Sequence, residues 1–102
     1  MKMDKLLKQA QRMQAQMAVM QEELATEFVE GMSGGGMVKA KANGHGDIIS
    51  ISIAKEVVDP ADVEMLEDLV LAAVKEAIRL GREHANERVN SITGGMSLPG
   101  MF

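Results

Sequence analysis

Apolar residues recur at steps of three and four from Met3 to Phe28, the spacing of one stripe along an amphipathic helix. The stripe consists of positions 3, 6, 10, 13, 17, 20, 24 and 28. Good helix formers such as Gln, Ala, Met, Lys and Leu occupy nearly every position up to Leu24. The pattern predicts a long helix over about residues 3–25.

After Thr26 the period shortens to that of a strand. Residues 27–30 are predicted to form a short strand, and residues 38–42 alternate between small apolar side chains and lysines. Residues 48–53 alternate between isoleucine and serine, and a turn that begins at Asn43-Gly44 separates the last two segments. The faces expected inward carry Val38, Ala40 and Ala42, and Ile49, Ile51 and Ile53; the faces expected outward carry Lys39 and Lys41, and Ser50 and Ser52.

The run from Ser33 to Gly36 contains three consecutive glycines and invites two interpretations. A loop that cradles phosphate needs a Gly-x4-Gly-Lys-[Ser/Thr] pattern that opens a helix. Here Met37-Val38-Lys39 follows the glycines and leads into a strand, and no G-x-G-x-x-G pattern is present. The run is therefore predicted to be the turn between two strands.

A second helix is predicted to begin at Asp59-Pro60, with Asp59 as its N-cap and Pro60 in its first turn. Its pattern runs to about Arg88 through an apolar stripe. That stripe contains Leu66, Leu69, Val70, Ala73, Ala77 and Leu80, and Leu71, Val74 and Ile78 widen it to about half the circumference. Gly81 is expected either to permit close packing or to weaken the helix.

The expected fold is α+β, with a long N-terminal helix, a small antiparallel three-stranded sheet and a long C-terminal helix. Helices of about 35 and 40 Å overhang strands of about 20 Å. Because the apolar stripes continue past the sheet, a homodimer is expected, with a helix pair folded back on itself as the alternative. The expected dimer interface comprises Met13, Met17, Met20, Leu24, Leu71, Val74 and Ile78.

Length and composition limit the remaining options. In this chain of 102 residues, a single domain is expected over residues 1–90, and the Gly- and Pro-containing segment 91–102 is expected to be a flexible tail. Without cysteine, with no apolar run of membrane-spanning length and no secretory signal, a cytoplasmic protein is expected. His45 and His84 do not fit a metal site, and His84 is expected to be packed or at the interface. No nucleophilic grouping is apparent, so we expect no enzyme, no cofactor and no small-molecule substrate.

The net charge of −4 conceals a segregated distribution. Lys2, Lys5, Lys8 and Arg12 lie on one arc of the first helix, offset from its apolar stripe. Lys75, Arg79 and Arg82 form a second basic stripe, whereas five acids lie between residues 59 and 68. Each stripe alone is typical of a solvated face, but two of them, doubled in a dimer, favour a clamp for nucleic acid. With no Trp or Tyr to stack on bases, duplex backbone contacts are the expectation.

Several segments together resemble the YbaB/EbfC family of nucleoid-associated proteins. They are LLKQAQRMQAQMAVMQEEL, GMSGGGMVKAKANGHGDIISISIAKEVVDP, MLEDLVLAAVKEAI and TGGMSLPGMF, which cover nearly the whole chain. The resemblance implies a tweezer-shaped homodimer that binds double-stranded DNA, alters its conformation and acts in nucleoid organisation and gene regulation. It also implies that the N-terminal helix and the C-terminal portion contact DNA.

Charge and position together select seven candidate DNA-binding residues: Lys2, Lys5, Lys8, Arg12, Arg79, Arg82 and Arg88. Lys39 and Lys41 are weaker candidates, because an exposed sheet face explains them equally well. The acids of residues 59–68 are expected to confine DNA to the helix tips. The alternative function is a protein-interaction adaptor that binds through its amphipathic helices and Met-rich stripe and depends on apolar positions such as Met96 and Leu98. Neither function involves a membrane.

Overall fold

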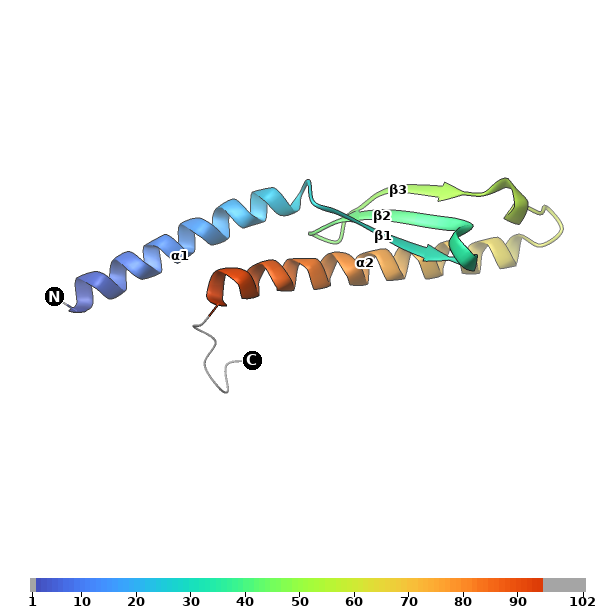
Figure 1. The fold of residues 1–102 in the computed structure, drawn as a ribbon. Coiled ribbons are helices and arrows are strands. Elements are labelled where there is room, and N and C mark those ends of the chain that lie inside the picture. The colour runs from blue at the N-terminus through green and yellow to red at the C-terminus, as the bar shows by residue number, and fades with distance from the viewer. Residues whose placement is uncertain (1, 95–102) are drawn as a thin grey trace.

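The computed structural model describes residues 2–94 and shows two long helices attached to a small sheet. The elements are α1 (Lys2–Leu24), β1 (Phe28–Ser33), β2 (Val38–Asn43), β3 (Ile48–Ile53) and α2 (Val63–Thr93), with short 3-10 turns at Gly34–Gly36 and Lys55–Val57. The molecule extends over 72 × 27 × 16 Å. In Figure 1, α2 runs along one face of the sheet, and α1 leaves the sheet end and continues past the C-terminal end of α2. The predicted α+β order is confirmed.

The sheet is fully antiparallel, with β2 between β1 and β3. Gly31 pairs with Ala40, and Ala40 pairs with Ile51, so these three residues lie on the same face. Val38, Ala40 and Ala42 are completely buried, whereas Lys39 and Lys41 are exposed. The predicted inward and outward faces of β2 are therefore correct.

The core is small because the sheet and α2 approach each other closely. Its buried cluster joins Val38, Ala40 and Ala42 to Ala73 and Ala77 of α2. On β1, a Cβ atom added at Gly31 would lie 2.3 Å from the backbone nitrogen of Ala77. A side chain at this glycine would thus collide with the helix backbone rather than with a movable side chain.

Gly81 is a second point of close approach. A Cβ atom there would lie 2.5 Å from the carbonyl oxygen of Asn43, at the end of β2. Of the two roles expected for Gly81, the structure supports close packing.

Two turns complete the sheet. Gly34, Gly35 and Gly36 all have positive φ angles, of 58°, 66° and 93°, which side chains rarely adopt. In the second turn, the buried Oδ1 of Asn43 accepts hydrogen bonds from the backbone nitrogens of His45 (2.9 Å) and Asp47 (3.0 Å). The glycine run is therefore a turn, as predicted.

The predicted boundaries of the second helix were wrong at both ends. Helix α2 begins at Val63, and its N-cap is Asp62, whose Oδ1 accepts a hydrogen bond from the backbone nitrogen of Met65 (3.2 Å). Asp59 instead closes a preceding turn by accepting from the nitrogen of Ala61. At the other end α2 continues to Thr93, so residues 91–93 are helical rather than part of the expected tail, and residues 95–102 lie outside the described residues.

Strand β3 differs from the expectation of a buried isoleucine face. Ile51 and Ile53 pair with Ala40 and Val38 and share their face, yet they remain 44% and 40% exposed. A bulge between Lys41 and Ala42 leaves Ile49 outside the pairing. Since α2 packs against β1 and β2 and scarcely reaches β3, the face of β3 that points toward the α2 layer lacks a cover among residues 2–94.

Candidate nucleic-acid interface

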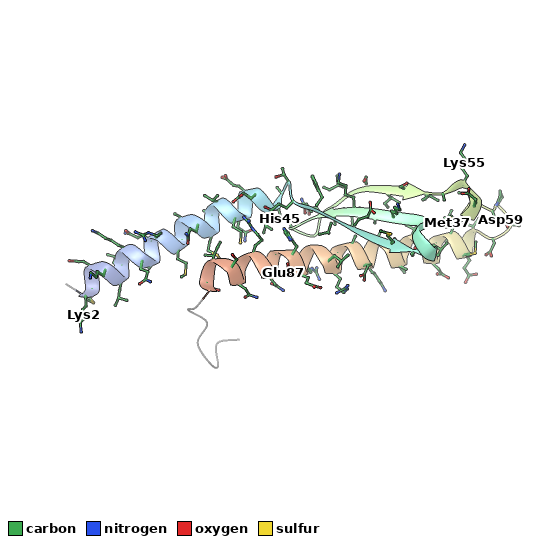
Figure 2. All side chains as sticks on the ribbon, viewed as in Figure 1. Lys2, Met37, His45, Lys55, Asp59 and Glu87 are labelled. Carbon is green, nitrogen blue, oxygen red and sulfur yellow. The ribbon has the colours of Figure 1, made fainter. Side chains whose placement is uncertain are left out.

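The first group of basic side chains lies on the projecting part of α1. Lys5, Lys8 and Arg12 line a shallow hollow of ≈ 260 Å³ together with Gln9. All three basic side chains are exposed, and no salt bridge involves them within residues 2–94. Lys2 lies at the tip of the same helix (Figure 2). The predicted α1 group is thus exposed, and its members Lys5, Lys8 and Arg12 form no salt bridge in the described part of the chain.

The second group lies on α2, where Lys75, Arg79 and Arg82 line another shallow hollow. Here acids neutralise part of the charge. Arg79 donates to Glu76 at 2.6 Å and to Glu83 at 2.9 Å. The hydrogen bond from Arg79 lowers the pKa of Glu76 below its usual value, and the same bond raises the pKa of Arg79. The α2 stripe therefore presents a weaker positive field than the α1 stripe.

Arg88 occupies a different setting from the other predicted contact residues. Its Nη2 donates to Glu23 at 3.1 Å, and its Nε lies 3.6 Å from Glu27. The same Glu27 carboxylate lies 2.6 Å from Nε2 of His84. These half-buried contacts join the end of α1 and the start of β1 to α2. We call Glu23, Glu27, His84 and Arg88 the α1–α2 junction.

Sequence reasoning missed this junction. The partners of Arg88 and His84 are 65 and 57 residues away along the chain, and neither helix pattern indicates which turn of α1 faces which turn of α2. The acidic run that begins at Glu22 was the available signal, because acids at the base of α1 need basic partners wherever the helices meet. His84 was expected to be packed or at the interface, and the structure shows it half-buried against Glu27 within the chain.

The apolar residues expected at a dimer interface divide into two classes. Met20 and Leu24 are each 1% exposed within a single chain, and Leu24 packs on Gly44. Met13 and Met17, like Val74 and Ile78, are partly exposed, and Leu71 is 53% exposed. Contacts within the chain therefore occupy Met20 and Leu24, while the other five retain surface for a partner.

Two other kinds of site receive no support from the structure. Within residues 2–94, no group of three or more His, Cys, Asp or Glu side chains is arranged to hold a metal ion. Neither helix in the same range is sufficiently long and apolar to cross a bilayer.

Comparison with known proteins shows to which family the chain belongs. A model of the YbaB/EbfC DNA-binding family matches residues 1–96. The chain belongs to this family. The resemblance inferred from the sequence is thereby confirmed, and the family is a DNA-binding rather than an enzyme family.

Named relatives of this YbaB/EbfC chain are nearly full-length matches. The nucleoid-associated protein TTE0040 of Caldanaerobacter subterraneus subsp. tengcongensis is 56% identical over 97 residues, which cover 95% of this chain and 87% of that protein. A nucleoid-associated protein of Pelotomaculum thermopropionicum is 46% identical over 100 residues, with coverage of 98% and 95%.

A solved structure has the same fold. The crystal structure of the uncharacterized protein HP0035 from Helicobacter pylori matches with a TM-score of 0.75 over 92% of this chain and 99% of that one. Its sequence identity is only 20%, so the similarity concerns the architecture of helix, sheet and helix alone.

Proposed function

We propose that this YbaB/EbfC protein is a nucleoid-associated protein that binds duplex DNA as a homodimer. Binding uses the basic face of α1, has loose sequence preference and changes the conformation of the DNA, with consequences for nucleoid organisation and gene regulation. One observation carries the DNA contact: an exposed basic surface on a projecting helix, formed by Lys5, Lys8 and Arg12 without acidic partners among residues 2–94.

The proposal of a homodimer is supported by the part of the sheet face at β3 that α2 does not cover. Ile51 and Ile53 are half-exposed on the face that α2 covers beneath β1 and β2. The neighbouring flank of α2 has an apolar hollow of ≈ 430 Å³ lined by Leu66, Glu67, Val70, Leu71 and Val74. Ile78 continues this flank beside Gly46 in the β2–β3 turn. A second copy in a two-fold arrangement would cover both surfaces, each by the same surface of the partner.

The mode of DNA binding follows from the available side chains. Lysine and arginine on the outside of a helix neutralise phosphates and release counterions, which provides affinity without reading bases. Phe28 is the one Phe, Tyr or Trp residue in the described part of the chain, and its ring already lies 4.3 Å from Nζ of Lys41. Stacking on bases is therefore not part of the proposal. Two basic helices that project from one dimer would favour DNA that bends to meet both.

The seven candidate residues are expected to contribute unequally. Lys5, Lys8 and Arg12 should contribute most, and Lys2 and Arg82 should add to them. Arg79 and Arg88 should contribute less, because each is already paired with glutamates. The adaptor alternative depends instead on the exposed apolar positions of α1 and α2.

A matched pair of double variants tests the α1 contact. Lys5→Glu with Lys8→Glu should weaken binding to a duplex by at least about a hundredfold, since about four phosphate contacts per dimer become repulsive. Lys39→Glu with Lys55→Glu makes the same change in net charge on exposed side chains near the sheet, and Figure 2 shows Lys55 at the opposite end of the molecule from Lys2.

Affinity is measured by fluorescence anisotropy, and dimerisation and thermal unfolding are followed in parallel. The control variant should lose at most a few-fold in affinity. Equal losses in both variants would mean that only net charge matters, and an unchanged affinity of the α1 variant would refute the assignment.

A further inference from the structure

The apolar stripe of α1 is a regular heptad seam. Met3, Leu6, Ala10, Met13, Met17, Met20 and Leu24 follow alternating steps of three and four, the spacing of a and d positions in a coiled coil. The C-terminal part of this seam already packs within the chain, because Met20 and Leu24 are buried. In contrast, Met3 is 78% and Leu6 is 63% exposed. One continuous helix-packing surface is thus covered at its base and bare at its tip.

The exposed N-terminal part of the seam has a hollow that could receive a side chain of a second helix. Leu6, Gln9, Ala10 and Met13 line a hollow of ≈ 250 Å³ in the surface of α1. These residues are successive d, g, a and d positions when Met3 is assigned to position a. Four residues in this relation form the hole that receives one side chain of a facing helix in knobs-into-holes packing. The hollow exists because alanine lies between two long side chains.

The flanks of the seam are compatible with a second copy of the same helix. The e and g positions beside the bare part carry Leu7, Gln9, Gln14 and Gln16, none of them charged, with Lys2 at the outermost g position. Identical helices therefore meet without like charges opposite each other along most of the contact. Lys5 and Arg12 occupy position c and Lys8 position f, so these three basic side chains stay outside a paired seam, whereas Gln9 lines both the basic hollow and the seam.

We propose that the N-terminal halves of α1 from two copies pair in an antiparallel coiled coil. In this register Met3 lies opposite Met13 and Leu6 lies opposite Ala10, so that a large side chain fills the hollow at the alanine. A parallel pair would instead bring together the positive ends of two helix dipoles and two Lys2 side chains. Because the contact spans less than two heptads it is weak in dilute solution, and it becomes effective where copies are held close together, as on one DNA molecule.

Site-directed crosslinking tests the pairing directly, because the chain contains no cysteine. Leu6→Cys and Ala10→Cys variants of the full chain, one of them isotopically labelled, are mixed at a high protein concentration, at which the weak contact forms, and are treated with a short bis-maleimide. Val19→Cys is the matched control, since Val19 is 55% exposed on the side of α1 away from the seam. Crosslinks between a Leu6→Cys chain and an Ala10→Cys chain should form with about tenfold higher yield than those between Val19→Cys chains, because pairing raises the effective concentration of the thiols.

Other outcomes overturn the pairing. A yield no higher than that of the control means that the seam does not pair, and a predominance of links between two Leu6→Cys chains means that the pair is parallel. A further variant carries both Leu6→Cys and Met96→Cys in one chain. A crosslink within that chain, in place of crosslinks between chains, means that the segment 95–102 occupies the seam.

A second variant separates this contact from DNA binding. In the Ala10→Cys chain, Leu6→Gln with Met13→Gln should abolish the excess crosslinking to the Leu6→Cys chain. In the chain without cysteine, the same two changes should lower the cooperativity of binding to long duplexes, while affinity for a duplex that holds one dimer stays within about twofold. If the crosslinks form but no duplex is bound, the proposed function fails and the pairing stands. If single-site binding is normal but the crosslinks are absent, the pairing fails alone.

Discussion

The two ends of this molecule are both built from a long helix, but α2 packs closely against the sheet whereas α1 projects with an exposed surface. Where α2 lies under the sheet, glycine and alanine bring backbones into contact, as at Gly31 and Ala77, and almost no volume can be added. Where α1 projects, long side chains such as Leu6 and Lys8 are exposed and make few contacts with the rest of the chain. Small residues therefore make the close contacts of the body, and large residues are exposed at the tip, where we propose that interaction takes place.

The largest expected effect is a loss of stability when a glycine in the contact between the sheet and α2 receives a side chain. Gly31→Val should reduce the free energy of unfolding by at least about 3 kcal/mol, because its Cβ would lie within 2.8 Å of three backbone atoms of α2. Gly35→Ala, in open space at a φ of 66°, should cost only about 1–2 kcal/mol from backbone strain. Urea unfolding followed by circular dichroism compares them, and equal losses would show that the contact between β1 and α2 does not limit stability.

The next largest effect concerns the uncovered flank of α2. Leu71→Asp should raise the dissociation constant of the proposed homodimer by about a hundredfold, since a carboxylate would be buried in an apolar contact. Val63→Asp is the control, because Val63 is almost equally exposed, at 54%, near the start of α2. Sedimentation equilibrium provides the measurement. Identical behaviour of the two variants would place the dimer contact elsewhere.

Substitutions of Arg88 and Arg12 should have different effects, the first on stability and the second on DNA binding. Arg88→Gln should lower the free energy of unfolding by up to about 1 kcal/mol, because it removes the ion pairs of Arg88 with Glu23 and Glu27 in the α1–α2 junction. Amide exchange in residues 20–27 should accelerate. Arg12→Gln should leave stability unchanged and weaken DNA binding about fivefold to tenfold. The reverse assignment of effects would contradict the division between junction and tip.

The smallest effect concerns acid titration on the exposed face of α2. Since the hydrogen bond from Arg79 lowers the pKa of Glu76 below 4.5, this pair stabilises the folded state above that pH, and the contribution is lost as the pH falls through the lowered value. Arg79→Gln should return the pKa of Glu76 toward 4.5, as read from carboxyl chemical shifts in an NMR titration. An unchanged pKa would show that Arg79 does not hold Glu76 in solution.

The periodic parts of the chain were predictable from local pattern. The helix over about residues 3–25, the faces of β2 and the glycine turn required only spacing and turn chemistry, and all three are present. The start of α2 was placed three residues too early, because Asp59 and Asp62 are equally good local caps and only the turn that Asp59 closes distinguishes them.

Pairings between distant segments were not predictable. The α1–α2 junction depends on which turns of two helices meet, and the half-exposed isoleucines of β3 depend on how far α2 extends beneath the sheet. The positive character of α1 could be inferred from charge spacing alone. The neutralisation of Arg79 by Glu76 and Glu83 was also within reach of the sequence, because the i, i+3 and i, i+4 spacing places these side chains side by side on one helix.

The central claim is that an unpaired basic face on α1 binds the DNA backbone. The most direct test titrates the protein against two unrelated labelled duplexes by fluorescence anisotropy across a series of salt concentrations. The logarithm of the binding constant should fall linearly with the logarithm of salt concentration, with similar slopes and affinities for both duplexes. The magnitude of the slope should decrease by about 0.9 for each lysine contact removed at Lys5 or Lys8 of a dimer. Absence of binding at low salt, or a slope that these lysines do not affect, would contradict the claim.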